Sequence, residues 1–170
     1  MELERARRDS FPDRKKLIEQ VQELAFYIPD RTTSLHVDAS RLHGLGFILK
    51  QQDPATSKWQ LVQAGSRFLS SAESRYAMIE LECLAAAWAM KTYRPFLEGL
   101  PAFDLITDHR PLIPILNEYS LDKLDNPRLL RLRLQMTRFI FNAKWVPGKI
   151  NVEAEASQER QSNAHQKQTS

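Results

Sequence analysis

The feature that most constrains the fold of this chain is a strand pattern that carries a charge. From Leu35 to Ser40 apolar and polar residues alternate strictly, and Asp38 falls on the polar side of that alternation. Successive side chains of a strand point to opposite faces of the sheet, so Leu35, Val37 and Ala39 are expected to enter a core while Asp38 lies on the other face. A carboxylate in a half-buried sheet needs a cation, a hydrogen-bond donor or water. Partners for the Asp38 carboxylate are therefore expected elsewhere in the sequence.

Hydrophobic patterns predict an α/β fold with a mixed sheet. The predicted strands are residues 34–39, 44–51, 59–65, 103–107 and 140–146. Short connections join the first three, which is typical of an antiparallel meander. The predicted helices are residues 13–25, 76–90, 112–116 and 126–138. Ser70 and Glu73 predict a capping box ahead of the second helix, and Asn126-Pro127 predict the start of the last one.

The chain has 170 residues, enough for one domain with a real core. We expect a lead-in and connecting helix over residues 1–30, the domain over 31–157 and a disordered polar tail over 158–170. A single cysteine, Cys83, excludes an intramolecular disulfide and is typical of a reducing compartment. The sequence has neither an apolar run of roughly 20 residues nor a signal-peptide core. These features predict an intracellular protein, in the cytoplasm or the nucleus, with no membrane partner.

Three acidic positions can converge on one edge of the predicted sheet. Asp38 lies in the first strand and Asp108 ends the fourth, while Glu82 or Glu80 lies in the long helix between them. Glu80 and Glu82 are about 200° apart around a helix, so only one of them can face the aspartates. Three converging carboxylates repel one another unless cations bind, and two Mg²⁺ ions about 4 Å apart suit phosphodiester hydrolysis.

Each of these acids also has an ordinary explanation. Aspartate is common at strand ends and in turns, and a helical glutamate is usually solvated. Only the combination of Asp38, Glu82 and Asp108 favours a metal site, and the sequence has no histidine and cysteine cluster with the spacing of a zinc site.

The net charge of +3 is unevenly distributed. No Asp or Glu lies between Asn126 and Val152, whereas the segment holds six basic residues, Arg128, Arg131, Arg133, Arg138, Lys144 and Lys149. This pattern fits either a solvated helix face or a surface for nucleic acid, with Arg128, Arg131, Arg138 and Lys149 as the expected phosphate contacts. Trp59 and Trp145 fall in predicted strands and are expected to pack in the core.

Several motifs carry a resemblance to a known family. They are Val37-Asp38-Ala39-Ser40, Gly44-Leu45-Gly46, Gly65-Ser66-Arg67-Phe68-Leu69, Ala72-Glu73-Ser74-Arg75-Tyr76, Ile79-Glu80-Leu81-Glu82-Cys83-Leu84-Ala85, Thr107-Asp108-His109-Arg110-Pro111-Leu112 and Val146-Pro147-Gly148-Lys149-Ile150-Asn151. In this order, from about residue 15 to residue 155, they closely resemble the ribonuclease H domain of gypsy-type long-terminal-repeat retrotransposon polyproteins. The resemblance implies the ribonuclease H-like fold, a five-stranded mixed sheet flanked by helices. It also implies a metal-dependent endonuclease that cleaves the RNA strand of RNA–DNA hybrids, and a reverse transcriptase domain in the same polyprotein as a partner.

The resemblance also assigns residues. Asp38, Glu82, Asp108 and Glu155 take the positions of the catalytic carboxylates, which hold two Mg²⁺ or Mn²⁺ ions. Glu82 is preferred over Glu80 because the family glutamate directly precedes the equivalent of Cys83-Leu84-Ala85. The chain departs from the family at Glu155, where an aspartate is usual, and the longer side chain displaces the ligand oxygens. We therefore expect a weakened enzyme.

A second class of function stays open at this stage. The chain could be a catalytically degenerate RNase H-like module that binds nucleic acid or packs against a reverse transcriptase. Glu155 and the polar tail favour this alternative, whereas the intact Asp38, Glu82 and Asp108 favour the enzyme. An integrase or transposase is disfavoured because those enzymes typically order their acids aspartate, aspartate, glutamate. No polymerase active-site motif is present, so no polymerase domain is expected in this chain.

Overall fold

This computed structural model describes residues 24–147 of the chain. The first three strands of the described part are antiparallel. They are β1 (Thr33–Ser40), β2 (Gly44–Gln52) and β3 (Trp59–Arg67). β1 pairs with β2, and β2 pairs with β3. The predicted meander is confirmed, and so is the alternation in β1, where Leu35, Val37 and Ala39 are buried and Asp38 is exposed.

The turn between β1 and β2 has strict local requirements. The hydroxyl of Ser40 accepts hydrogen bonds from the N–H groups of Leu42 and His43, at 3.3 and 3.2 Å. Gly44 then has a φ of +87°, and a Cβ at this position would lie 2.1 Å from the carbonyl oxygen of Arg67. Only glycine meets both conditions without strain. The turn therefore fixes β2 beside the end of β1 that carries Asp38.

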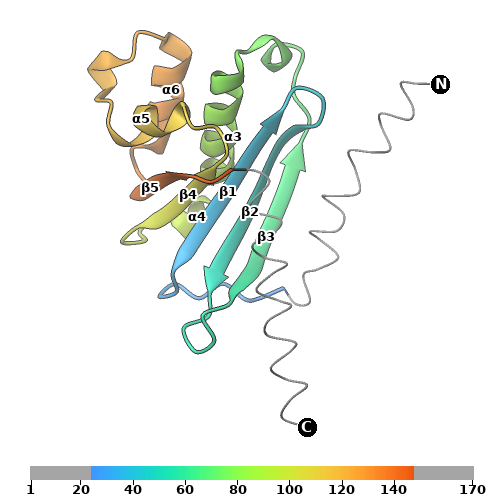
Figure 1. Cartoon of the computed structure of the whole chain (residues 1–170), viewed down its shortest axis with the longest axis vertical. Helices are drawn as coiled ribbons and strands as arrows, with labels where there is room; N and C mark the ends of the chain where they lie inside the picture. The colour runs from blue at the N-terminus through green and yellow to red at the C-terminus, as the bar shows by residue number, and fades with distance from the viewer. Residues whose placement is uncertain (1–23, 148–170) are drawn as a thin grey trace, which may run out of the picture. The chain divides into compact units, whose positions relative to one another are not determined.

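The sheet is completed by two parallel strands, β4 (Phe103–Thr107) and β5 (Phe141–Trp145). β4 pairs with β1, and β5 pairs with β4, which gives the strand order β3-β2-β1-β4-β5 (Figure 1). The five-stranded mixed sheet expected from the sequence is thus present, with the first and fourth strands as neighbours. Because β1 and β4 are parallel, their carboxyl ends meet at one edge of the sheet. Asp38 lies near the end of β1, and Asp108 directly follows β4.

Helices flank the sheet. They are α3 (Met78–Thr92), α4 (Arg94–Leu97), α5 (Leu112–Asn117) and α6 (Pro127–Met136), with short 3₁₀ turns η1 (Glu73–Arg75) and η2 (Leu121–Lys123). α3 packs against β1 and β2, and α6 lies beside α3 (Figure 1). The small residues Ala85, Ala86 and Ala89 of α3 are fully buried, which lets the helix approach the sheet closely. Within residues 24–147, no helix combines the length and the apolar character that crossing a membrane requires.

The start of the long helix differs from the prediction. Ser70 and Glu73 do exchange the two hydrogen bonds of a capping box, at 2.8 and 3.2 Å, but the box lies in the turn that leads into η1 and not at the start of α3. Glu73 also accepts two hydrogen bonds from the Arg67 guanidinium, so the box fastens this loop to the end of β3. The backbone is extended at Tyr76, and α3 begins only at Met78.

The two strand tryptophans are also not core residues. Trp59 is 41% exposed and Trp145 is 42% exposed. Trp59 lies on β3 and Trp145 on β5, and these are the two edge strands of the sheet. An edge strand has a neighbour on only one side, so a large ring there keeps part of its surface in solvent.

The predicted N-terminal lead-in and C-terminal tail lie mostly outside the described residues. The lead-in and nearly all of the predicted helix 13–25 fall there, as does the predicted tail 158–170. Ala25, at the end of that predicted helix, is not helical, because its N–H donates to the carbonyl of Leu61. The cap of α6 is confirmed: the Asn126 side chain accepts hydrogen bonds from the N–H groups of Arg128 and Leu129.

Candidate metal centre

The centre begins with Asp38, which β1 presents on the polar face of the sheet. The residue opposite it on β2 is Gly46, which has no side chain to cover the carboxylate. Asp38 is therefore exposed although the residues on either side of it, Val37 and Ala39, are buried. The local pattern of alternation is what places a charge at this open position.

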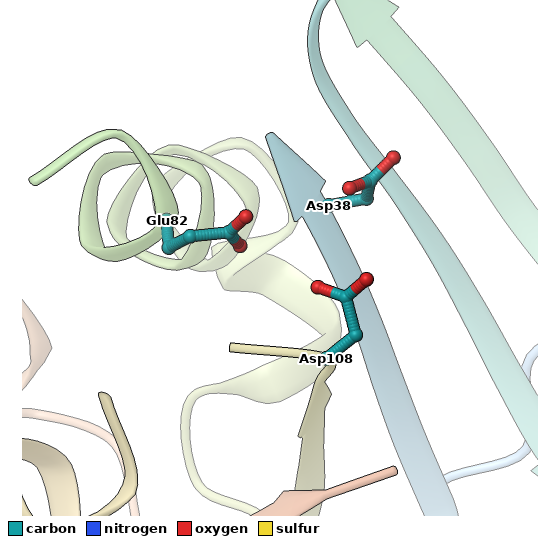
Figure 2. Close-up of side chains that lie close together, drawn as sticks. All are labelled: Asp38, Glu82 and Asp108. Atoms are coloured by element: carbon teal, nitrogen blue, oxygen red, sulfur yellow. The ribbon is translucent and has the colours of Figure 1, made fainter. Parts of the chain in front are cut away.

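Glu82 approaches the same position from α3. Its carboxylate extends from the helix toward the ends of β1 and β4, where Asp38 and Asp108 lie (Figure 2). One carboxylate oxygen from each of the three residues lies within 4.8 Å of the others. The structure thus brings together three of the four carboxylates that the sequence singled out. Glu155, the fourth, lies outside the described residues.

The electrostatics of the cluster are unfavourable without a cation. Glu82 is only 2% exposed. Burial first, and then the charges of Asp38 and Asp108, raise the pKa of Glu82 from its ordinary 4.5 to about 8, against hydrogen bonds from the Ala39 N–H and the Thr107 hydroxyl. Burial and the charge of Asp38 also raise the pKa of Asp108, while His109 acts to lower it. Burial and mutual repulsion therefore make it costly for Asp38, Glu82 and Asp108 all to be ionised at once.

The residues present fit a divalent cation. The Oε2 atom of Glu82 is buried and has no hydrogen-bond partner among residues 24–147, so it is an oxygen that a cation could satisfy. Asp38 and Asp108 are exposed, which leaves the cluster open to solvent on one side. Three carboxylates without histidine or cysteine form the hard donor set that Mg²⁺ and Mn²⁺ prefer.

Glu80, the alternative to Glu82, has a different role. It is bound by the Arg128 guanidinium at 2.9 Å, by the Asn126 amide at 2.9 Å and by the Ala77 N–H at 2.9 Å. Burial acts to raise the pKa of Glu80, but these hydrogen bonds together lower it below its ordinary value. Glu80 therefore links the start of α3 to the start of α6 and faces away from the aspartates.

Comparison with protein families identifies the domain. Residues 28–139 match the model of the RNase H-like domain found in reverse transcriptase. The chain belongs to this family. The match includes β1, α3 and β4, the three elements that position the acidic cluster.

Curated relatives of this RNase H-like domain are retrotransposon polyproteins. The chain is 31% identical over 147 residues to the retrovirus-related Pol polyprotein from transposon opus of Drosophila melanogaster, a match that covers 86% of this chain and 14% of that protein. It is 33% identical over 150 residues to the Pol polyprotein from transposon 297 of the same species, covering 87% of this chain and 13% of that protein. The chain thus spans a small part of each polyprotein. The gypsy-type assignment is not decided by these matches and stays a prediction.

A solved structure supports the fold. The protease-reverse transcriptase of a foamy virus, determined in complex with double-stranded DNA, matches 78% of this chain and 26% of its own with a TM-score of 0.53 and 12% sequence identity. At this identity the similarity shows the fold alone.

The four predicted phosphate contacts of the RNase H-like domain differ in their surroundings. Arg128 pairs with Glu80 and lies over the Tyr76 ring at 3.8 Å, and Arg138 lies 3.8 Å from Glu98. Arg131 is exposed on α6. Lys149 lies outside the described residues. Nucleic-acid binding by these four residues stays a prediction, with the charges of Arg128 and Arg138 partly offset.

Sequence reasoning missed some groups around the cluster. Thr107 is 1% exposed, and its hydroxyl interacts with Glu82 and also accepts the N–H of His109. Trp145 reaches back from β5, and its indole N–H donates to the carbonyl of Asp108 at 3.0 Å. Thr107 belongs to a motif that carried the family resemblance, whereas Trp145 precedes one directly, and only the pairing of β4 with β5 shows that Trp145 and Asp108 meet.

Proposed function

We propose that this domain is a metal-dependent endonuclease that cleaves the RNA strand of RNA–DNA hybrids. The observation that carries the proposal is the cluster of Asp38, Glu82 and Asp108, with ligand oxygens within 4.8 Å of one another. The family supports it, because the cluster occurs in an RNase H-like domain found in reverse transcriptase. A bound cation would also compensate the buried Glu82 oxygen that lacks a hydrogen-bond partner among the described residues.

The three residues have distinct tasks in this proposal. Bound divalent cations would supply an activated water and would offset the charge that develops at the phosphate. Asp38 and Asp108 present their carboxylates on the exposed side, where a nucleic-acid backbone can approach. Glu82 holds its carboxylate beneath them and must lose the proton that burial favours. Glu155 is proposed as a fourth ligand on the basis of the family motif.

The hydrogen bonds around the cluster determine where these oxygens lie. The Ala39 N–H and the Thr107 hydroxyl hold Glu82 from the ends of β1 and β4. The indole of Trp145 holds the backbone of Asp108. Such supports keep ligands within the narrow tolerance that metal-assisted chemistry demands.

The test is cleavage of a hybrid labelled on its RNA strand by the purified 170-residue chain with Mg²⁺ or Mn²⁺. The matched variants are Asp38→Asn and Asp104→Asn. Asp104 is also an aspartate of the sheet, but it pairs with Lys144 at 2.7 Å and is not part of the cluster. We expect cleavage by the parent and by Asp104→Asn, and loss of cleavage in Asp38→Asn and after chelation.

Equal background cleavage by all three proteins would contradict the proposal. Hybrid binding by such an inactive parent would instead support the degenerate module that binds nucleic acid.

A further inference from the structure

An open hollow lies beside Asp108, since one of its lining residues, Trp145, donates a hydrogen bond to the carbonyl of Asp108. It has a volume of about 430 Å³ and is lined by Arg110, Pro111, Ile113, Pro114 and Trp145. Apart from the guanidinium, its lining is aromatic, proline and aliphatic surface. None of these residues is among the carboxylates of the candidate metal centre. We refer to this hollow as the Arg110–Trp145 site.

The site is fastened to the metal centre through the backbone. The Trp145 indole N–H donates to the carbonyl of Asp108 at 3.0 Å, and the Val146 N–H donates to the carbonyl of Thr107 at 3.0 Å. Arg110 follows Asp108 by two residues. A group bound at the Arg110–Trp145 site is therefore held in a fixed relation to a phosphate at the carboxylates.

The guanidinium of Arg110 has N–H donors that are available to a ligand. Its guanidinium lies 5.5 Å from the centroid of the Trp145 ring, and in the described part of the chain it has neither an acidic partner nor a hydrogen-bond acceptor. Arg128 and Arg138, by contrast, each have a glutamate nearby. A guanidinium that an aromatic ring holds in place, with its five N–H donors unused, is suited to a phosphate.

The rest of the lining suits the non-ionic part of a nucleotide. The half-exposed ring of Trp145 and the flat surfaces of Pro111 and Pro114 offer contact area without hydrogen-bonding demands. In an RNA–DNA hybrid the bases are paired with one another, so the surface of a strand that such side chains can contact is its sugar, beside the phosphate that a guanidinium can bind. An acidic peptide would use the cation but would leave the aromatic surface without a matching partner.

We propose that the Arg110–Trp145 site binds a nucleotide of the strand being cut, adjacent to the phosphate at the carboxylates. Arg110 contacts the phosphate of that nucleotide, and Trp145 contacts its sugar. This inference rests on the proposed function, since it takes nucleic acid as the ligand. It assigns to the site the task of setting the position of the strand relative to Asp108.

The test separates binding from cleavage. An RNA–DNA hybrid is titrated against the full chain carrying Asp38→Asn, without divalent cations, at salt concentrations from about 50 to 300 mM, and binding is followed by fluorescence anisotropy. Adding Arg110→Ala should weaken binding about tenfold and should reduce the slope of log affinity against log salt by about one. Arg94→Ala is the matched control, because Arg94 is also a surface arginine but pairs with Glu98 across α4.

Trp145→Leu, made in the same background, tests the aromatic contact. It should weaken binding with a smaller change in the salt slope than Arg110→Ala causes, because no charge is lost, and Trp145→Phe should restore most of the affinity. Circular dichroism establishes that each variant is folded. In the active chain, Arg110→Ala should also broaden the distribution of cleavage positions, which a purely structural residue would not do.

The outcomes are distinguishable from failure of the proposed function. Hybrid binding that depends on Arg110 and Trp145 supports the site even if no variant cleaves RNA. Identical affinity and salt slope in Arg110→Ala and Arg94→Ala overturn the site even if the parent cleaves hybrid. A parent that binds no nucleic acid, or a site that binds only acidic peptides, overturns it as well.

Discussion

Replacing Glu82 by glutamine should stabilise the cation-free protein, and more so as the pH rises. The pKa of Glu82 is about 8 in the fold and 4.5 in its ordinary state, chiefly because of burial and then because of Asp38 and Asp108. Between these two values the folded state binds a proton that the unfolded state has released. Stability contributed by this group is therefore lost as the pH rises through that window, and it levels off above the folded pKa.

The size of the effect follows from the width of the window. Each pH unit corresponds to about 1.4 kcal/mol, so the three units from about pH 5 to pH 8 give about 4 kcal/mol as an upper value. Glutamine does not titrate, and the other titrating groups are common to both proteins. The free energy of unfolding of Glu82→Gln relative to that of the parent should therefore rise by about 2 to 4 kcal/mol over this range.

Urea unfolding in EDTA at several pH values measures this difference. The control is Glu80→Gln, which removes a carboxylate from the same helix whose pKa is lowered by its hydrogen bonds and whose loss should destabilise the protein. Mg²⁺ added at about pH 8 should then stabilise the parent and not Glu82→Gln, because a ligand that binds only the folded state raises its stability. A relative stability of Glu82→Gln that stays constant from pH 5 to pH 8 would refute the reasoning.

Three further predictions concern single residues. Glu80→Ala should lower the free energy of unfolding in urea by about 1 to 3 kcal/mol, because Asn126 and Arg128 lose the carboxylate to which they donate hydrogen bonds. Stabilisation by Mg²⁺ should persist in this variant, and its loss would place Glu80 in the metal centre. Gly44→Ala should cost at least about 2 kcal/mol by the same measurement, because of the positive φ and the 2.1 Å approach to the Arg67 carbonyl, and a neutral effect would contradict this turn. Glu155→Asp should raise the rate of hybrid cleavage, and a chain that cleaves no better with aspartate would contradict the expected weakening.

Local patterns were sufficient to predict most of the sheet. The alternation around Asp38 predicted which face of β1 is buried, and the short connections predicted the meander. The Asn126-Pro127 pair predicted the start of α6 because the cap depends only on neighbouring residues. The convergence of Asp38 and Asp108 depended on the condition that the first and fourth strands are neighbours, and the pairing of β1 with β4 meets that condition.

Features set by tertiary contacts were not predictable in the same way. The capping box at Ser70 is present, but its glutamate also pairs with the Arg67 guanidinium at the end of β3, and the box precedes η1 instead of α3. The exposure of Trp59 and Trp145 depends on their strands being at the edges of the sheet, which strand composition does not reveal. The lack of an acidic partner for Arg110 within residues 24–147 likewise depends on which residues the fold brings near it.

The contrast between Glu80 and Glu82 indicates where function and stability separate in this domain. The two residues are of the same type, lie two positions apart on one helix and are both almost fully buried. Glu80 accepts hydrogen bonds from a guanidinium, an amide and a backbone N–H, so its charge is stabilised and its pKa is lowered. Glu82 is placed beside two further carboxylates, keeps one oxygen without a partner, and its pKa is raised. The same helix therefore gives one buried glutamate several hydrogen-bond donors and places the other where its ionised form is destabilised. Such local losses of stability are concentrated at functional sites.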